Sequence, residues 1–512
     1  MARRTLMIEV VACATTDEAL RAYRAAHPRT DIVELRLDVI RDLDLDRLLA
    51  AKGKPKLLSM RSREQGGGAR PSDRAAVLAK IVRSSAEYLD IEPKDTDLPA
   101  LRRATGPKRV LSWHDFQSTP LDLRDRLQWL LGQRRADLVK LVTFAELAGD
   151  VLRVRDLLRG AGEERLIAFC MGPKGVPSRI LAGSWGSAAV FAPRRGAPES
   201  AAGQVPLEDL VEVYRIDDLR PETGLLGVLG SPVSHSLSPV LHNAALAALQ
   251  IDLRYLPFEA TTLAEFLPVM AELRIKGLSV TLPFKEAFLP HLDAIDPAAR
   301  RCGAVNTVIK VWNRLEGHNT DIEASVEPLR HLLPLRGASV GVMGAGGAAR
   351  ALVEGLRPEG ARVTLFNRTA SRARALARAT GARHLPWRRL RGFRCDLLVN
   401  ATPVGMTPLA GRTPVPSSWI RARRVYDLVY NPKETLFLTR ARRRGLEALG
   451  GSEMFLAQGA AQFRLFTGQE PPPEVMRAVL DRSLARGGLA APGEAGKRSP
   501  RRRSGGFRHD HR

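Results

Sequence analysis

A lysine lies in the middle of an apolar run in the first half of the sequence. Lys140 has two apolar residues on each side, in a stretch that predicts a β-strand over 138–143. Burial among such neighbours disfavours the ammonium form and lowers the pKa of the amine. A neutral amine is the form that attacks a ketone to give a Schiff base. The sequence therefore predicts Lys140 as a nucleophile for Schiff-base chemistry.

Charged residues and a histidine occupy other predicted strands of this half. His114 lies near the end of the preceding strand, where it can act as a general acid and base. In the run 32–38, a period of two places Glu34, Arg36 and Asp38 on one face and apolar residues on the other. Charges that point inward cost free energy unless they are paired. They indicate either a reactive site or a satisfied internal ion pair.

These residues require a scaffold that gathers several strands around one centre. Eight β-rich runs alternate with helical patterns through the first part of the chain, and Arg61 ends the third run. The runs are 8–14, 32–38, 56–61, 88–92, 109–115, 138–143, 166–171 and 188–193. This alternation predicts an α/β fold, a (β/α)₈ TIM barrel.

Motifs along this half resemble those of type I 3-dehydroquinate dehydratases. They are VELRLD, SMRSREQGG, SWHDFQSTP, the Lys140 strand, CMGPKGVPSRILAG, GSAAVFA and SAAGQ. The resemblance implies that Lys140 forms the imine, that His114 removes the neighbouring proton and assists departure of the hydroxyl, and that Glu34 supports the histidine. It also implies that Met171 packs beside the lysine and that other side chains hold the substrate. These are Arg36, Arg61, Arg179, Ser200 and Gln204.

A glycine-rich turn in the second half joins a predicted strand to a predicted helix. The strand covers 339–343, the helix covers 348–356, and a second strand follows at 362–366. Gly344 and Gly346 begin a G-x-G-x-x-A pattern, which lets the backbone approach a pyrophosphate at the helix N-terminus. We therefore predict a Rossmann dinucleotide-binding domain.

The residues after the second strand bear on the choice of cofactor. Asn367, Arg368 and Thr369 stand where an NAD enzyme would offer an acidic residue. An arginine there favours the extra phosphate of NADP, although an arginine that only stacks on adenine would leave NAD usable. The expected cofactor is NADP. Its expected contacts are Gly344, Ala345, Gly346, Gly347, Ala348, Asn367, Arg368, Thr369, Thr402 and Met406.

The polar residues before this turn do not indicate a functional site by themselves. Ser236 and Ser238 crowd the start of a helix predicted over 239–249, which indicates either an anion site or ordinary N-capping by Ser238. Lys285 and Asp321 lie in separate motifs at the ends of apolar elements, and their spacing carries no meaning of its own.

Taken together, the motifs of this half resemble shikimate dehydrogenase. They are SPVSHSLSP, SVTLPFKE, GAVNT, NTD, GAGGAAR, NRT, NATPVGM and MFLAQGAAQFRLFTG. The resemblance implies that Lys285 and Asp321 form the catalytic pair at the substrate ketone. It also implies that six further residues line the substrate pocket. Ser236 and Ser238 would bind the carboxylate, Thr281, Asn306 and Gln458 the hydroxyls, and Tyr430 would flank them.

Two residues depart from these family patterns. Gln65 stands where the first family often has Glu in R-x-x-x-E-G-G, and Glu64 precedes it. Ser279 stands where the second family commonly has Asn. The first departure bears on a contact from a loop over the site, and the second bears on substrate affinity because a hydroxyl reaches less far than an amide.

The motifs divide the chain into successive units. We place the barrel at 1–218, a substrate-binding domain at 222–328 completed by 453–486, the NADP-binding domain at 329–452 and a disordered basic tail at 487–512. The start of the chain imitates a signal peptide weakly and predicts a first β-strand better. A homodimer through the barrel is a further expectation.

Composition limits the class of protein. The net charge is +24, but the basic residues show no aromatic interleaving, so we expect no specific nucleic-acid partner. No apolar run approaches the ~20 residues of a membrane span, so we expect no membrane partner. The four cysteines lack metal or disulfide spacing, which predicts no metal site and a reducing cytoplasm.

The two resemblances imply consecutive reactions, since the product of the first, 3-dehydroshikimate, is the substrate of the second. We therefore predict a bifunctional shikimate-pathway enzyme that dehydrates 3-dehydroquinate and then reduces 3-dehydroshikimate with NADPH. One alternative is an NAD-linked quinate/shikimate dehydrogenase fused to the dehydratase for catabolism. Another is a binding or scaffold protein that uses its basic tail.

Overall fold

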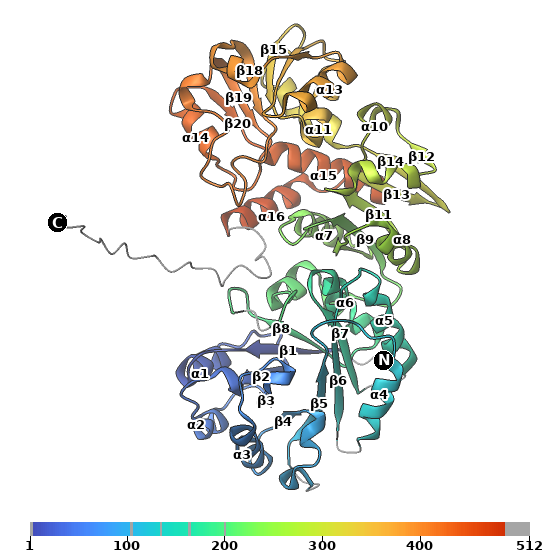
Figure 1. Ribbon diagram of the computed structural model, residues 1–512, viewed down its shortest axis with the longest axis vertical. Helices are drawn as coiled ribbons and strands as arrows, with labels where there is room; N and C mark the ends of the chain where they lie inside the picture. Colours follow the sequence, from blue (N-terminus) through green and yellow to red (C-terminus); the bar gives the residue numbers. More distant parts are fainter. Residues whose placement is uncertain (1–3, 103–105, 134–135, 162–164, 199–200, 487–512) are drawn as a thin grey trace, which may run out of the picture.

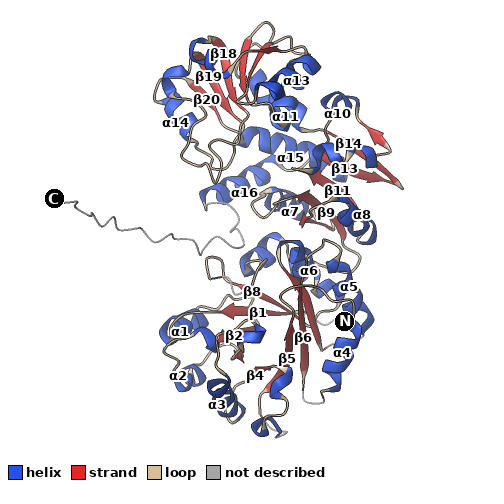
Figure 2. Cartoon of the chain, viewed as in Figure 1, coloured by secondary structure: helices blue, strands red, loops and turns tan. Residues whose placement is uncertain are grey.

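The computed structural model describes residues 4–102, 106–133, 136–161, 165–198 and 201–486. Three sheets with their helices follow one another along the chain (Figures 1 and 2). The predicted substrate residue Ser200 and the predicted tail 487–512 lie outside the described residues. No helix among the described residues is long and apolar enough to cross a membrane.

The first sheet is an eight-stranded parallel barrel with the strand order β7-β6-β5-β4-β3-β2-β1-β8. The barrel closes between its last two strands, β7 and β8. There the N–H of Ala188, just before β8, donates to the carbonyl of Leu166, the first residue of β7, at 2.8 Å. The strands are β1 (Leu6–Val11), β2 (Ile32–Arg36), β3 (Lys56–Ser59), β4 (Tyr88–Ile91), β5 (Lys108–His114), β6 (Leu138–Phe144), β7 (Leu166–Met171) and β8 (Ala189–Pro193). The predicted barrel fold is confirmed.

Two apolar layers stabilise the barrel, and helices cover its outside. They are α1 (Thr16–Arg24), α2 (Leu45–Ala50), α3 (Pro71–Val82), α4 (Leu123–Gly132), α5 (Asp150–Ala161) and α6 (Val176–Leu181). Val33 and Leu35 of β2 pack outward in the large core beneath the helices, whereas Ile32 belongs to a smaller cluster inside the barrel. The period of two therefore sends Glu34 inward, as predicted.

The prediction that β2 continues as a strand to residue 38 is wrong. The strand ends at Arg36, and Leu37–Val39 form a 3₁₀ turn. The turn lets both Asp38 carboxylate oxygens accept from the Arg36 guanidinium, each at 2.9 Å. Two charge-assisted hydrogen bonds of this kind stabilise the turn conformation.

The second sheet is mixed, with the order β10-β9-β11-β13-β14-β12, and β13 runs antiparallel to β11 and β14. Its strands are β9 (Gly224–Gly230), β10 (Leu253–Glu259), β11 (Ile275–Val280), β12 (Ala294–Ile295), β13 (Thr307–Val311) and β14 (Arg314–His318). Its helices are α7 (Ser238–Ala248), α8 (Leu263–Glu272), α9 (Phe284–Ala287) and α10 (Pro297–Cys302). The predicted helix over 239–249 is thus confirmed with a shift of one residue.

The third sheet is parallel and has the order β17-β16-β15-β18-β19-β20. Its strands are β15 (Ser339–Met343), β16 (Arg362–Phe366), β17 (Arg383–His384), β18 (Cys395–Asn400), β19 (Ala422–Asp427) and β20 (Glu447–Leu449). Its helices are α11 (Asp321–Arg330), α12 (Gly347–Leu356), α13 (Ala370–Thr380) and α14 (Leu436–Arg442). The strand order reverses beside β15, which is where doubly wound sheets bind dinucleotides.

The chain then returns to the second sheet. The last helices, α15 (Ser452–Thr467) and α16 (Pro473–Ala485), lie between the two sheets and beside α7 (Figure 1). Gln462 of α15 is buried; its amide donates to the Thr307 hydroxyl at 3.0 Å and accepts from the Ser279 hydroxyl at 2.7 Å. These bonds tie the end of the chain to β11 and β13.

Candidate active sites

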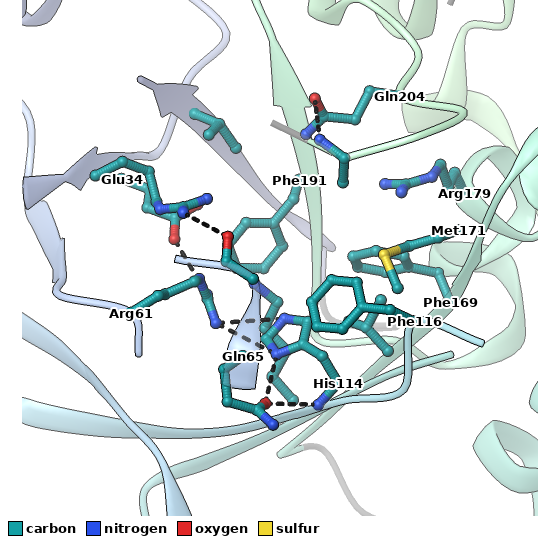
Figure 3. Close-up of a pocket in the computed structure, with 16 residues that line it drawn as sticks. Glu34, Arg61, Gln65, His114, Phe116, Phe169, Met171, Arg179, Phe191 and Gln204 are labelled. Atoms are coloured by element: carbon teal, nitrogen blue, oxygen red, sulfur yellow. Dashed lines mark hydrogen bonds and ion pairs between the residues drawn. The ribbon is translucent and has the colours of Figure 1, made fainter. Parts of the chain in front are cut away.

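A polar pocket occupies the centre of the barrel (Figure 3). Residues of the strands β1, β2, β5, β6, β7 and β8, of the segments that follow β3, β5 and β8, and of helix α6 line it. The lining residues are Val10, Glu34, Arg36, Arg61, Gln65, Gly66, His114, Phe116, Lys140, Val142, Phe169, Met171, Arg179, Phe191, Ala201 and Gln204. The pocket therefore brings together all but one of the residues predicted for the first reaction; the exception is Ser200, which is not among those described.

A buried arginine just after β3 connects the charged side chains of this site. Arg61 Nη2 lies 2.9 Å from an Asp90 oxygen and 3.3 Å from a Glu34 oxygen. Each carboxylate also accepts a hydroxyl hydrogen bond, Glu34 from Ser59 at 2.7 Å and Asp90 from Ser112 at 2.6 Å. Both readings of the inward charges, an ion pair and a reactive site, are therefore compatible with the geometry. The sequence analysis missed Asp90, although its place within the apolar run of β4 was the available signal.

The lysine of β6 is buried against an aromatic ring. Lys140 Nζ lies 3.7 Å from the centre of the Phe191 ring. Burial, aided by the charge of Arg61, lowers the pKa of Lys140 to about 7, while Glu34 and Asp90 oppose the shift. A substantial share of the amine is thus neutral near neutral pH.

The carboxylate of β2 remains ionised beside this amine. Burial would raise the pKa of Glu34, but the charges of Lys140 and Arg61 outweigh it and lower the pKa to about 2. The pocket therefore holds a permanent negative charge next to a titrating lysine. That charge stabilises any cation that forms on the nitrogen of Lys140.

The histidine of β5 is oriented by a neutral amide. The Gln65 side-chain oxygen accepts from the His114 backbone N–H at 2.9 Å and lies 3.0 Å from Nδ1 (Figure 3). An amide oxygen only accepts, so this contact assigns the ring proton to Nδ1 and leaves Nε2 as a base. Glu64, the residue before, pairs instead with the exposed Lys94. The loop contact that the Gln65 departure put in question is therefore present, with an amide in the place of a carboxylate.

Positive charge surrounds this ring. Arg61 Nη1 lies 3.3 and 3.4 Å from the two ring nitrogens of His114. Enclosure by the protein, followed by the charges of Arg61 and Lys140, holds the pKa of His114 well below its usual range. The imidazole is consequently neutral at physiological pH and ready to accept a proton.

A second reactive pair lies between the second and third sheets. Lys285 Nζ and Asp321 Oδ2 are 2.6 Å apart, and both side chains are mostly buried. Lys285 belongs to the short helix α9, and Asp321 is the first residue of α11. The structure therefore brings the predicted pair together across 36 residues of chain.

Other predicted residues surround this pair. Asn306 donates to the Thr320 hydroxyl at 2.9 Å and accepts from the Thr320 N–H at 2.8 Å, just before Asp321. Thr320 also donates to the Gln458 carbonyl at 3.3 Å. The Gln458 amide donates to its own helix at Phe455. Tyr430 stacks on Phe455 with ring centres 4.2 Å apart, and burial raises the pKa of this tyrosine to about 12.

The serines lie at the start of α7. Ser238 is the first helical residue, and its backbone N–H donates to the Ser236 hydroxyl at 3.3 Å. The capping position is Leu237, and no side chain caps the helix there. The alternative that Ser238 acts as an ordinary N-cap is therefore wrong. Thr281, at the end of β11, bonds β9 through its N–H to the Leu229 carbonyl at 2.9 Å.

The glycine-rich turn has the form of a dinucleotide cradle. Gly344 has a φ of +122°, and a Cβ there would lie 2.6 Å from the Ala401 carbonyl oxygen, so a side chain is excluded. Helix α12 begins without a side-chain cap, and a Cβ on Gly346 or Gly347 would meet open space. Free backbone N–H groups at a helix N-terminus with room in front fit a pyrophosphate.

The remaining predicted cofactor residues lie near this edge of the sheet. Arg368 and Thr369 are exposed after β16, and Asn367 donates to the Thr369 carbonyl at 2.9 Å. Met406 is 42% exposed in the loop after β18. Thr402, in the same loop, donates its hydroxyl to Asn400 at 2.6 Å. Ala345 and Ala348 flank the cradle glycines and are half-buried.

A buried network that the sequence analysis missed supports these loops. Asp427, at the end of β19, is inaccessible to solvent and accepts from Asn400 at 2.8 Å and from the Thr435 hydroxyl at 2.6 Å. Burial raises the pKa of Asp427 to about 6 despite these bonds. An acidic residue within the apolar run 424–430 was the available signal.

Comparison with known proteins places both halves. The type I 3-dehydroquinase family matches residues 8–221, the shikimate dehydrogenase substrate binding domain matches 228–308, and the shikimate 5'-dehydrogenase C-terminal domain matches 451–480. The bifunctional 3-dehydroquinate dehydratase/shikimate dehydrogenase of Arabidopsis thaliana is 32% identical over 484 residues, which cover 88% of this chain and 80% of that protein.

The chain belongs to the family of bifunctional 3-dehydroquinate dehydratase/shikimate dehydrogenases. The shikimate biosynthesis protein AroDE of Chlamydia pneumoniae is 30% identical over 85% of this chain and 90% of its own length. The NADP(+) shikimate dehydrogenase of Moorella thermoacetica is 43% identical over 53% of this chain and 98% of its own length. The protein is thus an enzyme with a lyase half and an oxidoreductase half, and the alternative of a binding or scaffold protein is wrong.

The amide beside His114 generates a first prediction. Gln65→Glu places a carboxylate at Nδ1 of His114, which stabilises the imidazolium and should raise the pKa of this histidine back toward its usual range. The measurement is an NMR titration of isotope-labelled histidine rings, with His114 assigned by loss of its signal in His114→Asn. Glu64→Gln serves as the control and should leave the titration unchanged. An unshifted His114 in Gln65→Glu would contradict the geometry.

The neighbouring charges generate a second prediction. The Glu34 carboxylate favours the ammonium form of Lys140, so Glu34→Gln should move the pKa of the amine further below about 7. The dehydratase pH profile should show this as an acid limb of kcat/KM that moves to lower pH, together with a lower maximum. A limb that stays in place or moves upward would mean that Glu34 does not set the charge of the lysine.

Proposed function

We propose that the barrel dehydrates 3-dehydroquinate to 3-dehydroshikimate through a Schiff base on Lys140. The observation that carries this proposal is the buried Lys140 amine, with a pKa of about 7, in one pocket with the neutral His114. Residues 222–328 and 453–486 then bind 3-dehydroshikimate, and residues 329–452 bind NADPH for its reduction to shikimate. The barrel unit is residues 1–218.

In the first reaction the amine of Lys140 attacks the ketone carbon, and loss of water gives an iminium. Nε2 of His114 removes the proton next to that carbon, and the C–H electron pair moves toward the iminium nitrogen to give an enamine. The enamine expels the hydroxyl group, which takes the proton from His114 and leaves as water. Hydrolysis of the conjugated iminium frees the product and restores Lys140.

The charges of the pocket suit these steps. Glu34 stays ionised and stabilises the cationic nitrogen, and Gln65 keeps the Nε2 face of His114 available. Arg36 and Arg179 supply positive charge for the substrate carboxylate, Gln204 supplies an amide for its hydroxyls, and Met171 packs beside the lysine. Arg61 anchors Glu34 and reaches His114.

In the second reaction the ion pair of Lys285 and Asp321 serves the substrate ketone. The Lys285 nitrogen lies 2.6 Å from an Asp321 carboxylate oxygen; Lys285 donates the proton to the ketone oxygen, and Asp321 keeps the lysine in place. Ser236 and Ser238 bind the carboxylate at the start of α7, and Thr281, Asn306 and Gln458 bind the hydroxyls beside Tyr430. The cofactor is NADP, whose reduced form, NADPH, would supply the hydride when bound.

A third prediction tests both sites in one solution. Wild-type enzyme given 3-dehydroquinate and NADPH should consume NADPH. Lys140→Ala should consume none from 3-dehydroquinate yet reduce added 3-dehydroshikimate at the normal rate. Lys285→Ala should do the reverse and accumulate the conjugated ketone, which is followed by its ultraviolet absorbance. Loss of both activities in either variant would contradict the assignment of two separate sites.

A fourth prediction concerns the cofactor. Arg368→Ala removes a charge-assisted contact with the extra phosphate, worth about 1.5–3 kcal/mol, and should raise KM for NADPH about 10- to 100-fold while activity with NADH changes little. Arg378→Ala, near the far end of α13, is the matched control. Equal losses with both cofactors would mean that Arg368 only stacks on adenine, and a wild-type preference for NADH would favour the catabolic alternative.

A further inference from the structure

The dehydrogenase half touches the barrel at the loops that follow β6 and β7. These loops lie at the same end of the barrel as the dehydratase pocket, and α8 of the second half lies near α5 (Figure 1). Two side-chain contacts cross the interface to α8. One joins Lys174 to Glu265, and the other joins Arg155 to Glu272.

The Lys174 ammonium is fully bonded at this interface. Its Nζ donates to the Glu146 carbonyl at 2.8 Å, to the Thr261 hydroxyl at 2.8 Å and to both Glu265 carboxylate oxygens at 3.1 Å. The side chains of Lys174 and Glu265 are only 15% and 8% exposed. One ammonium thus joins the loop after β6, the loop after β7 and the start of α8.

Glu265 also forms hydrogen bonds on both sides of the interface. It accepts from the Thr262 N–H at 3.2 Å as part of a capping box for α8, and from the Ala148 N–H of the barrel at 3.1 Å. Burial would raise the pKa of Glu265, but these N–H groups and Lys174 outweigh it and the pKa is lowered. Breaking a partly buried ion pair of this kind is unfavourable, because either partner alone is left without its counter-charge.

The barrel side of this contact leads directly to the pocket. Gly172 lies two residues before Lys174 in the same loop. The Gly172 N–H donates to the Ala202 carbonyl at 3.0 Å. Gly203 packs so closely that a Cβ there would lie 2.4 Å from the Gly172 carbonyl oxygen. Residues 201–204, the wall segment, therefore rest on Gly172, and the wall segment supplies Ala201 and Gln204 to the pocket.

The loop after β6 is connected to the same place. The Ala145 N–H donates to the Met171 carbonyl at 3.0 Å, one residue before Gly172. Lys174 holds the next residue of that loop through the Glu146 carbonyl. Glu265 therefore fixes two neighbouring loops through one ammonium, and the wall segment that lines the pocket rests on the second of them.

We propose that Glu265 of the dehydrogenase half, acting through Lys174, is a positioning residue for the dehydratase reaction. It holds the loop at Gly172 and so keeps the wall segment at its place in the pocket. The dehydratase site is thus completed by the second half of the chain. This inference rests on the proposed dehydratase function of the barrel.

The fifth prediction is a defect in substrate binding, because the wall segment contacts substrate and takes no part in the proton transfers. In the full-length protein, Lys174→Met should raise KM for 3-dehydroquinate about tenfold and change kcat less than twofold. Glu265→Gln keeps the helix cap, loses the charge and should change KM in the same direction. Lys174→Arg, which can still donate to Glu265 and Glu146, should restore most of the affinity.

The control uses the other contact of the same interface. Arg155 donates to the Glu272 carbonyl at 3.1 Å and to its carboxylate at 3.2 Å. Arg155→Met removes a comparable cation, and among the described residues the hydrogen bonds of Arg155 go to Asp156 and Glu272 and not to the loop at Gly172. It should leave KM for 3-dehydroquinate unchanged. Reduction of added 3-dehydroshikimate should be normal in all four variants, which reports that the second half is folded.

Hydrogen exchange gives a readout that needs no substrate. Peptides that contain residues 201–204 should exchange faster in Lys174→Met than in Arg155→Met. A KM and an exchange rate that agree between these two variants would overturn the inference. Wild-type protein without dehydratase activity would instead overturn the proposed function, and the exchange comparison would still decide whether the second half positions the wall segment.

Discussion

A single guanidinium sets the electrostatics of the barrel. Arg61 is permanently charged and lies between two buried carboxylates, Glu34 and Asp90. It compensates both of them, which permits charge inside a core that would otherwise exclude it. The same charge disfavours protonation of Lys140 and His114. Arg61 thus helps to keep Glu34 ionised and adds to the effect of burial in keeping Lys140 and His114 neutral, which is the combination that imine chemistry needs.

Neutral groups refine this balance. Phe191 places a ring below the Lys140 amine and gives it contact without a counter-charge. Gln65 orients His114 without adding the negative charge that would hold a proton on the ring. The carboxylates that act on the Lys140 amine, Glu34 and Asp90, both pair with Arg61. The stability of the site depends on complete pairing, since a single missing partner leaves a charge buried alone.

Most strands of the barrel and its reactive residues could be predicted from the sequence. The run 166–171 predicts β7 to the residue, because a short apolar strand bounded by polar turns has few alternatives. The predicted end of β2 was wrong because a side-chain interaction replaces the backbone pairing of the sheet there: Asp38 pairs with Arg36. Asp90 was overlooked although its pattern is that of Lys140, a charge within an apolar strand.

Contacts across long stretches of chain were outside the reach of periodicity. Gln462 bonds Ser279 across 183 residues, and Lys174 bonds Glu265 across 91. Each of these residues is ordinary in its own helix or loop, and only the packing of distant elements gives it a partner. The Lys285–Asp321 pair was found through family motifs rather than spacing for the same reason. Its geometry depends on the path from α9 through β13 and β14 to α11.

The return of α15 to the second sheet has a consequence for a chain that is being synthesised. Translation delivers the barrel first, and N-terminal domains generally fold as they emerge. The second sheet emerges next, but its buried Ser279 and Thr307 wait for Gln462, which leaves the ribosome only after the whole third sheet. The nascent protein therefore has its barrel, together with Glu265 of α8, while its dehydrogenase still lacks α15. The two sites mature in the order in which a substrate molecule meets them.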